Sequence, residues 1–201
     1  RLTNNVFNDA QPAWSPNGLE LVFVSNRDLG KLGIWKMSNL DGSDQAIKLT
    51  PNNMDAVTPV WCTDPNNLTG PGKIYFGFKD DAGKTGISSV NPDGTGLTKI
   101  IEENFSGNIT QEPTCSPNGL ELAFETSRDV NSEVYISNIN GSNQRNITNN
   151  PSSDGQPRWS SNNNIAFVTD RDTPGTGELN FYLINPDSTG LTRLTNLAGV
   201  E

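Results

Sequence analysis

The chain has 201 residues, 32% of them apolar, and a formal net charge of −9 at pH 7. So acidic a surface repels polyanions, which argues against nucleic acid as a ligand, and no apolar run approaches the roughly 18 residues of a membrane-spanning helix. There is no histidine. The commonest general base is therefore absent, and a Ser-His-Asp site cannot form within this chain.

One short phrase recurs along the chain and indicates an internal repeat. "RLTNN" opens the sequence, and related phrases begin at residues 48, 98, 146 and 192. The leucine or isoleucine of each phrase, at positions 2, 49, 100, 147 and 194, lies 47, 51, 47 and 47 residues after the one before it. A period near 45 residues is typical of β-propeller blades.

The first repeat predicts four strands in chain order. Residues 11–18 form a short extended run that ends in a Pro-Asn-Gly turn, and residues 19–28 alternate apolar and polar side chains. Residues 33–42 form a third run with an Asp-Gly turn, and residues 45–50 form a fourth. Tight glycine turns between such runs predict antiparallel hairpins, so one repeat is a four-stranded meander.

Three further units follow the same order. Their first strands begin at residues 58, 112 and 156, their second strands at 74, 120 and 165, and their third strands at 87, 133 and 181. We therefore predict an all-β fold, a β-propeller of four-stranded antiparallel blades, with residues 1–201 as one propeller domain or segment. The predicted blades are residues 8–50, 55–101, 109–148 and 154–195, after a leader at residues 1–7.

Tryptophan recurs where the first strand of a unit ends. Trp14, Trp61 and Trp159 are predicted to be packing anchors between blades, because a blade cannot bury both faces alone. Cys115 takes the tryptophan position in the third unit. Cys62 directly follows a tryptophan, so the two cysteines are offset by one residue and should point to opposite sheet faces, which argues against a disulfide between them.

The repeat resembles the WD40-like PD40 repeat of TolB-type propellers. The shared pattern covers residues 12–18, 20–28, 34–35, 41–42 and 49–50, and it returns four times over nearly the whole chain. The second unit departs from it, with Lys79-Asp80-Asp81 in place of the Ser-x-Arg-Asp turn. The resemblance implies a propeller whose innermost strands line a central channel, in a protein that is periplasmic, extracellular or on the cell surface.

The same resemblance leaves function open. Members of the family include TolB, the propeller domains of prolyl-oligopeptidase-like peptidases and some pectin-degrading lyases, and fold alone does not choose among them. We expect a non-enzymatic, protein-binding or scaffolding propeller that uses no cofactor. The alternatives are a carbohydrate- or small-ligand-binding propeller and the accessory propeller of a peptidase or larger complex.

The number of blades in the complete ring is also open. The fourth unit has its own Leu-Thr phrase, so Leu2 and Thr3 are left over from a preceding blade. Either four blades close with a redundant leader, or the chain is an arc completed by missing chain, a protein partner or a second copy. An open arc would expose apolar faces, which is unfavourable in water. The absence of an initial methionine indicates an N-terminus that is processed or truncated.

Polar residues are expected to ring one mouth of the channel, where strand 1 begins and strand 2 ends. Arginine–carboxylate bridges there could tie turn to linker, or the ring could form a platform for a peptide or protein; paired carboxylates could also serve in glycoside hydrolysis. The candidate partner-binding residues are Asp9, Gln11, Arg27, Arg128, Asp154, Gln156 and Arg171.

No metal site is predicted. Asp64, Asp80 and Asp81 offer hard oxygen ligands of the kind that calcium takes. The sequence has no Asp-x-Asp-x-Asp-Gly loop, however, so solvated surface charge is the favoured interpretation. The expected partner is a protein or a second copy of the chain, without nucleic acid and without membrane insertion.

Overall fold

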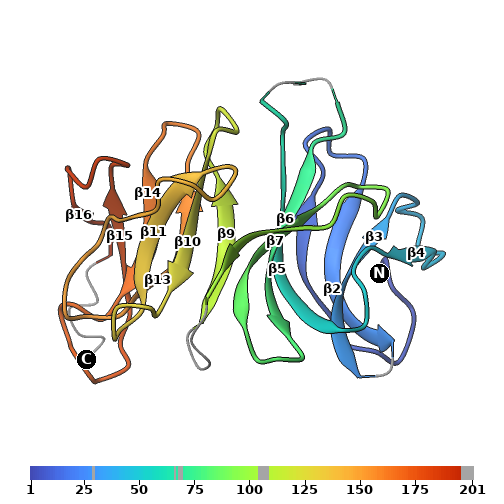
Figure 1. Cartoon of the computed structure of the whole chain (residues 1–201), viewed down its shortest axis with the longest axis horizontal. Helices are drawn as coiled ribbons and strands as arrows, with labels where there is room; N and C mark the ends of the chain where they lie inside the picture. Colours follow the sequence, from blue (N-terminus) through green and yellow to red (C-terminus); the bar gives the residue numbers. More distant parts are fainter. Residues whose placement is uncertain (29, 66, 68–69, 104–108, 196–201) are drawn as a thin grey trace. The chain divides into compact units, whose positions relative to one another are not determined.

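The computed structural model describes residues 1–28, 30–65, 67, 70–103 and 109–195. Within these ranges the chain forms strands β1 to β16 and no helix, in four four-stranded sheets (Figure 1). The described residues therefore contain no helix that could cross a membrane. The all-β prediction and the four-stranded antiparallel blades are confirmed.

Each sheet is a meander in which neighbours in sequence are hydrogen-bonded. Blade 1 consists of β1 (Asp9–Trp14), β2 (Leu21–Asp28), β3 (Lys31–Met37) and β4 (Ala46–Lys48). Blade 2 consists of β5 (Met54–Cys62), β6 (Lys73–Asp80), β7 (Thr85–Val90) and β8 (Thr98–Glu102). Blade 3 consists of β9 (Thr110–Cys115), β10 (Glu121–Thr126), β11 (Glu133–Asn138) and β12 (Arg145–Asn146). Blade 4 consists of β13 (Asp154–Trp159), β14 (Ile165–Thr169), β15 (Asn180–Ile184) and β16 (Thr192–Arg193).

The chain divides into two compact units, Arg1–Pro113 and Thr114–Glu201. Unit 1 holds blades 1 and 2, unit 2 holds most of blade 3 and all of blade 4, and the boundary falls within β9.

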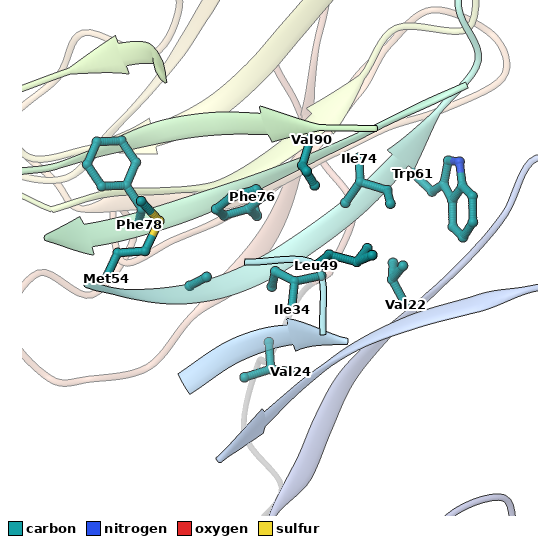
Figure 2. Packing of buried hydrophobic residues seen from close by; sticks show 11 residues of the cluster. Val22, Val24, Ile34, Leu49, Met54, Trp61, Ile74, Phe76, Phe78 and Val90 are labelled. Atoms are coloured by element: carbon teal, nitrogen blue, oxygen red, sulfur yellow. The ribbon is translucent and has the colours of Figure 1, made fainter. Parts of the chain in front are cut away.

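The core of unit 1 lies between blades 1 and 2. Blade 1 contributes Val22, Val24, Ile34 and Leu49, and blade 2 contributes Met54, Ala56, Trp61, Ile74, Phe76, Phe78 and Val90. Figure 2 shows Trp61 beside Ile74 of its own blade, with Val22 facing it from blade 1. Strand β2 is buried over consecutive residues instead of every second one, so both of its faces are covered.

Unit 2 repeats this packing. Blade 3 contributes Ala123, Val134, Ile136 and Ile147, and blade 4 contributes Ile165, Phe167, Tyr182 and Ile184. Trp159 is partly buried against this cluster. In both units the tryptophan of the later blade therefore packs toward the blade that precedes it.

Trp14 departs from the expectation that it anchors blade packing. Its exposed fraction is 56%, against 6% for Trp61, and it lies outside the core cluster of unit 1. The reason is directional, because a tryptophan at this position packs on a preceding blade and the core of unit 1 lies on the other side of blade 1.

The Leu-Thr motif lies at the end of the fourth strand of a blade and is hydrogen-bonded to the third strand. In blade 1 the Leu49 N–H donates to the Ile34 carbonyl at 2.8 Å, and the Ile34 N–H donates to Thr50 Oγ1 at 3.0 Å. The same two bonds recur at Ile147, Thr148 and Val134, and at Leu194, Thr195 and Phe181. In blades 1 and 3 the threonine closes the strand while the aliphatic residue, Leu49 or Ile147, enters the inter-blade core.

The turn between the first two strands needs a left-handed residue. Gly18 and Gly119 supply it at φ 71°, and each N–H closes the turn on the carbonyl of a serine three residues earlier. In blade 4 this position is Asn163, at φ 65°, which makes the same bond to Ser160. Asparagine tolerates this conformation better than other side chains, so the turn survives the loss of Pro-Asn-Gly.

The two cysteines of the chain, Cys62 and Cys115, are both disulfide-bonded. The expectation drawn from strand alternation is therefore wrong. That rule compares faces within one sheet, whereas Cys62 ends β5 of blade 2 and Cys115 ends β9 of blade 3.

Candidate binding surface

A left-handed residue interrupts the first strand of every blade. Gln11, Thr58, Glu112 and Gln156 have φ between 51° and 55°, and each precedes a proline. The β1–β2, β5–β6 and β13–β14 registers shift at this point, which marks a β-bulge. Such a conformation costs of order 1–3 kcal/mol for a residue with a side chain, and bulges of this kind re-aim side chains near functional sites.

Within unit 1 the bulges are joined by hydrogen bonds. The Thr58 N–H donates to Gln11 Oε1 at 2.8 Å, and the Glu112 N–H donates to Thr58 Oγ1 at 3.0 Å. Each bulge therefore offers its backbone N–H to the side chain of the bulge before it in sequence. We call this series of bonds the bulge relay.

In unit 2 the Gln156 N–H is taken by a carboxylate instead. It donates to Glu125 Oε2 at 3.1 Å, and Ser132 Oγ donates to the other oxygen of Glu125 at 3.0 Å. A Cβ added at Gly155 would lie 2.4 Å from Glu125 Oε2, so a larger residue there would require this carboxylate to move. Glu125 thus supports the bulge from β10.

Arg27 forms a closed cluster at the end of β2. Its guanidinium bonds to Asp9 Oδ2 at 2.9 Å and to Asp44 Oδ1 at 3.0 Å. Its carbon Cζ lies 5.3 Å from the ring centroid of Phe23 and 5.1 Å from that of Trp35. The side chains of Arg27 and Asp9 are each only 11% exposed, so this ion pair belongs to the body of blade 1.

The bonds within this cluster set the ionisation of Asp9. Burial by itself would raise the pKa of the Asp9 carboxyl, but hydrogen bonds from Ser25, Asn5 and Arg27 outweigh it and hold the pKa below its usual value. Asp9 is therefore ionised at neutral pH and has little capacity to act as an acid.

Blade 4 contains the same arrangement. Arg171 Nη2 bonds to both carboxylate oxygens of Asp154, at 2.9 and 3.0 Å, and Cζ lies 5.2 Å from the Phe167 centroid and 4.8 Å from the Tyr182 centroid. The Asp154 side chain has no exposed area. A buried carboxylate of this kind requires its cationic partner.

Blades 2 and 3 vary the arrangement. In blade 3 Arg128 stacks over Phe124 and Tyr135, and its guanidinium donates to the amide oxygen of Gln144. In blade 2, which has no arginine in this turn, Lys99 from β8 lies 5.0 Å from the Phe78 centroid and pairs with Asp80. Blades 1, 3 and 4 have an aromatic pair across the second and third strands, and blade 2 has Phe76 opposite Ser88 instead, so both the ring and the cation differ there.

A family model decides the relationship of the chain to known proteins. The model of the TolB β-propeller domain, PD40, matches residues 36–199. The chain belongs to this family. No curated protein matches its sequence.

Solved structures share the PD40 fold at low sequence identity. A putative TolB from Agrobacterium tumefaciens has a TM-score of 0.74 at 18% identity, over 94% of this chain and 65% of that one. TolB from Acinetobacter baumannii has a TM-score of 0.73 at 17% identity, over 94% of this chain and 44% of that one. A puromycin hydrolase has a TM-score of 0.65 at 18% identity, over 92% of this chain and 30% of that one. The chain thus spans less than two thirds of each of these proteins, and the likeness shows the fold alone.

The seven predicted site residues of this PD40 chain fall into two groups. Asp9 with Arg27, and Asp154 with Arg171, lie together as ion pairs inside blades 1 and 4. Arg128 bonds to Gln144 at the same turn of blade 3. Gln11 and Gln156 are exposed at the bulges. Of the seven, these two have side chains with the most open access to a partner, and their binding role stays a prediction.

The sequence reasoning missed Thr58, Glu112 and Glu125. The usable signal was a polar residue directly before proline at one register position in all four units. Residues before proline favour extended conformations, so this signal points away from the left-handed bulge that the fold imposes.

Two of the three acidic residues considered for calcium are held in ion pairs. Asp80 pairs with Lys99 and Asp81 pairs with Lys31. Among the residues that the structure describes, no group of three or more acidic or cysteine side chains is placed to hold a metal ion.

All three tyrosines of the chain are buried and resist ionisation. Burial and the charge of Asp64 raise the pKa of Tyr75 to about 12. Burial, followed by the hydrogen bond to Asp129, raises the pKa of Tyr135 to about 12. Burial and the hydrogen bonds to Asp172 also raise the pKa of Tyr182.

We expect the folded chain to form little tyrosinate at pH 10, where unfolded tyrosine is half ionised. Because the pKa is higher in the folded state, the stabilisation is complete below about pH 10 and is lost as the pH rises toward about 12. Near-ultraviolet absorbance titration with and without denaturant measures this difference. Half-ionised tyrosine in the folded chain at pH 10 would contradict the burial of these hydroxyl groups.

Proposed function

We propose that the chain is a non-enzymatic, protein-binding propeller that acts as a scaffold outside the cytoplasm. The observation that carries this proposal is the bulge in the first strand of every blade, where a polar residue has strained, left-handed backbone. Asp9 and Arg27 in blade 1, and Asp154 and Arg171 in blade 4, are held in ion pairs. The exposed side chains left at the bulges of these blades are the amide of Gln156 and the amide of Gln11, whose Oε1 already accepts from the Thr58 N–H. Such amides suit recognition of peptide backbone.

The cysteines support the proposed location. Both are disulfide-bonded, and disulfides persist in oxidising compartments such as the periplasm and the extracellular space. The TolB likeness favours the same compartment by analogy.

A second candidate is the accessory propeller of a hydrolase. The observation in its favour is that a puromycin hydrolase matches 92% of this chain with only 30% of its own length. The native polypeptide distinguishes the two, because a mass well above 21.8 kDa that includes a hydrolase domain would support the second candidate.

Protein capture tests the leading proposal. The immobilised chain is exposed to an extracytoplasmic extract, and retained proteins are identified for the wild type, for the double variant Gln11→Ala/Gln156→Ala and for Leu19→Ala. Leu19 is 68% exposed in the first turn and serves as the control. We expect a protein that the wild type and Leu19→Ala retain and the double variant loses. Equal retention by all three would overturn the proposed surface, and hydrolysis of an aminoacyl amide by the chain alone would overturn the non-enzymatic assignment.

A further inference from the structure

Glu133, at the start of β11, is a buried carboxylate whose hydrogen-bond donors are all neutral. The residue is only 2% exposed. Its Oε1 accepts from the Asn131 side-chain amide at 2.9 Å and from the Asn150 N–H at 3.1 Å, and its Oε2 accepts from the Thr148 hydroxyl. Within the described ranges of the chain, no lysine or arginine pairs with Glu133. A buried carboxylate is costly without a cation to balance it.

Blade 3 differs in charge from the other blades at this place. On the fourth strand, the residue paired with Tyr135 is Asn146. The residues at the matching position of blades 1, 2 and 4 are all basic, namely Lys48, Lys99 and Arg193. Two residues before Tyr135 lies Glu133, where the other blades have Gly33, Gly86 and Asn180. Blade 3 thus gains an acidic residue and lacks the basic one, so the repeat itself supplies no balancing charge.

Four oxygens converge on the side-chain nitrogen of Asn131. Nδ2 lies 2.9 Å from Glu133 Oε1 and 2.9 Å from the Asn150 carbonyl oxygen. The carbonyl oxygens of Ser152 and Ser132 lie 2.6 and 3.4 Å from the same nitrogen. An amide NH₂ group has only two hydrogens, so it cannot serve all of these acceptors. The nitrogen therefore occupies a point that suits a small cation better than an amide.

Backbone bonds hold these oxygens in place. The Asp154 N–H donates to the Ser132 carbonyl at 2.8 Å, which ties the linker after blade 3 to the turn between β10 and β11. The Ser152 N–H donates to Asn150 Oδ1 at 2.9 Å, and the Asn150 amide donates to the Asp154 carboxylate. All of these residues belong to unit 2. The arrangement is therefore complete within this unit.

We propose that the oxygens around the Asn131 amide bind a calcium ion, which joins the β10–β11 turn to the linker that enters blade 4. The ligands are Glu133, the carbonyl oxygens of Asn150 and Ser152, and Asn131, which turns Oδ1 toward the ion in place of Nδ2. Calcium takes carboxylates, asparagine and backbone carbonyls and water, in a total of about six to eight ligands. A calcium ion here is independent of any protein partner at the bulges.

The ligand set also predicts the affinity. Only one carboxylate takes part, so the site differs from a cluster of acidic side chains. Calcium affinity rises with the charge of the ligands, and a site of this kind belongs to the weak extracellular class, with Kd of about 10⁻⁴–10⁻³ M. Magnesium should bind poorly, because it requires a near-ideal octahedron of ligands at about 2.0–2.1 Å.

Calorimetric titration of the EDTA-treated and desalted 201-residue chain with calcium chloride tests the proposal. We expect one ion per chain, and Glu133→Gln should weaken binding about tenfold or more because it removes the only charged ligand. Glu178→Gln makes the same change at an exposed position of unit 2 and should bind as the wild type does. No heat of binding at millimolar calcium, equal binding by Glu133→Gln, or equal affinity for magnesium chloride would overturn the calcium site.

Asn131→Asp provides a second test that does not depend on how well Glu133→Gln folds. It places a second carboxylate against Glu133, so without calcium the repulsion between like charges should lower the melting temperature. With calcium the variant should bind about tenfold more tightly than the wild type, and its melting temperature should rise further than that of the wild type. A rise no larger than that of the wild type would contradict the proposed role of Asn131 as a ligand and overturn the site.

Discussion

Replacing Trp61 with alanine is expected to lower the free energy of unfolding of unit 1 by about 3–5 kcal/mol, the usual cost of truncating a buried large aromatic side chain. Trp61 is 6% exposed, packs in the core between blades 1 and 2, and donates its indole N–H to the Pro71 carbonyl at 2.7 Å. The substitution leaves a cavity and an unpaired carbonyl together. Urea unfolding followed by circular dichroism measures the loss.

Trp14→Ala is the matched control for this prediction. It removes the same side chain from the same position of blade 1, where the indole is 56% exposed. In dilute solution it should cost less than about 1 kcal/mol. Equal losses for the two variants would show that position in the repeat, and not burial, sets the contribution of the tryptophan.

Replacing Arg171 with alanine is expected to cost about 3–5 kcal/mol in unit 2, because it leaves a buried carboxylate without its partner. Asp154 has no exposed side-chain area and receives both of its charged hydrogen bonds from Arg171 through one nitrogen. Arg171→Lys should recover only part of the loss, since lysine lacks the planar group that stacks on Phe167 and Tyr182. Urea unfolding of the three proteins measures both effects.

Arg145→Ala provides the comparison for an exposed ion pair. Arg145 bonds to Glu121 at 3.2 Å and its side chain is 43% exposed, so its loss should cost about 0.2–1 kcal/mol. In a second comparison, Asp154→Asn in the Arg171→Ala background should restore stability by removing the buried charge. A double variant no more stable than Arg171→Ala would place the cost in lost packing of the guanidinium instead.

The architecture could be predicted from the sequence because the length of the repeat and the glycine turns inside it both indicate a four-stranded blade. Repeats 47 or 51 residues apart, each with alternating runs and glycine turns, admit few folds other than stacked four-stranded sheets. The Leu-Thr phrase could be recognised as a strand end, and the structure supplies its chemistry in the paired bonds between Thr50 and Ile34.

The candidate surface was harder to predict. The sequence does not show on which neighbouring blade a tryptophan packs, and it does not show where the backbone is strained. The recurrence of tryptophan does not tell which neighbour it packs on, so the exposure of Trp14 could not be read from its similarity to Trp61. The bulge at Gln11 and its counterparts contradicts the preference of residues before proline, and only contacts between sheets explain why it persists. The disulfide state of Cys62 was likewise missed, because alternation of side chains along a strand says nothing beyond that one sheet.

The hydrogen bonds of Thr58 give the series of first strands β1, β5 and β9 a direction, because donor and acceptor follow the chain order. Thr58 donates through its backbone toward Gln11 and accepts through its hydroxyl from Glu112. A substitution of Thr58 therefore keeps the bond to Gln11, which uses the Thr58 backbone, and removes the bond from Glu112, which uses the Thr58 hydroxyl. A substitution at a bulge therefore affects the next bulge along the chain and not the one before it. The side chains at these positions thus distinguish the order of the blades along the chain.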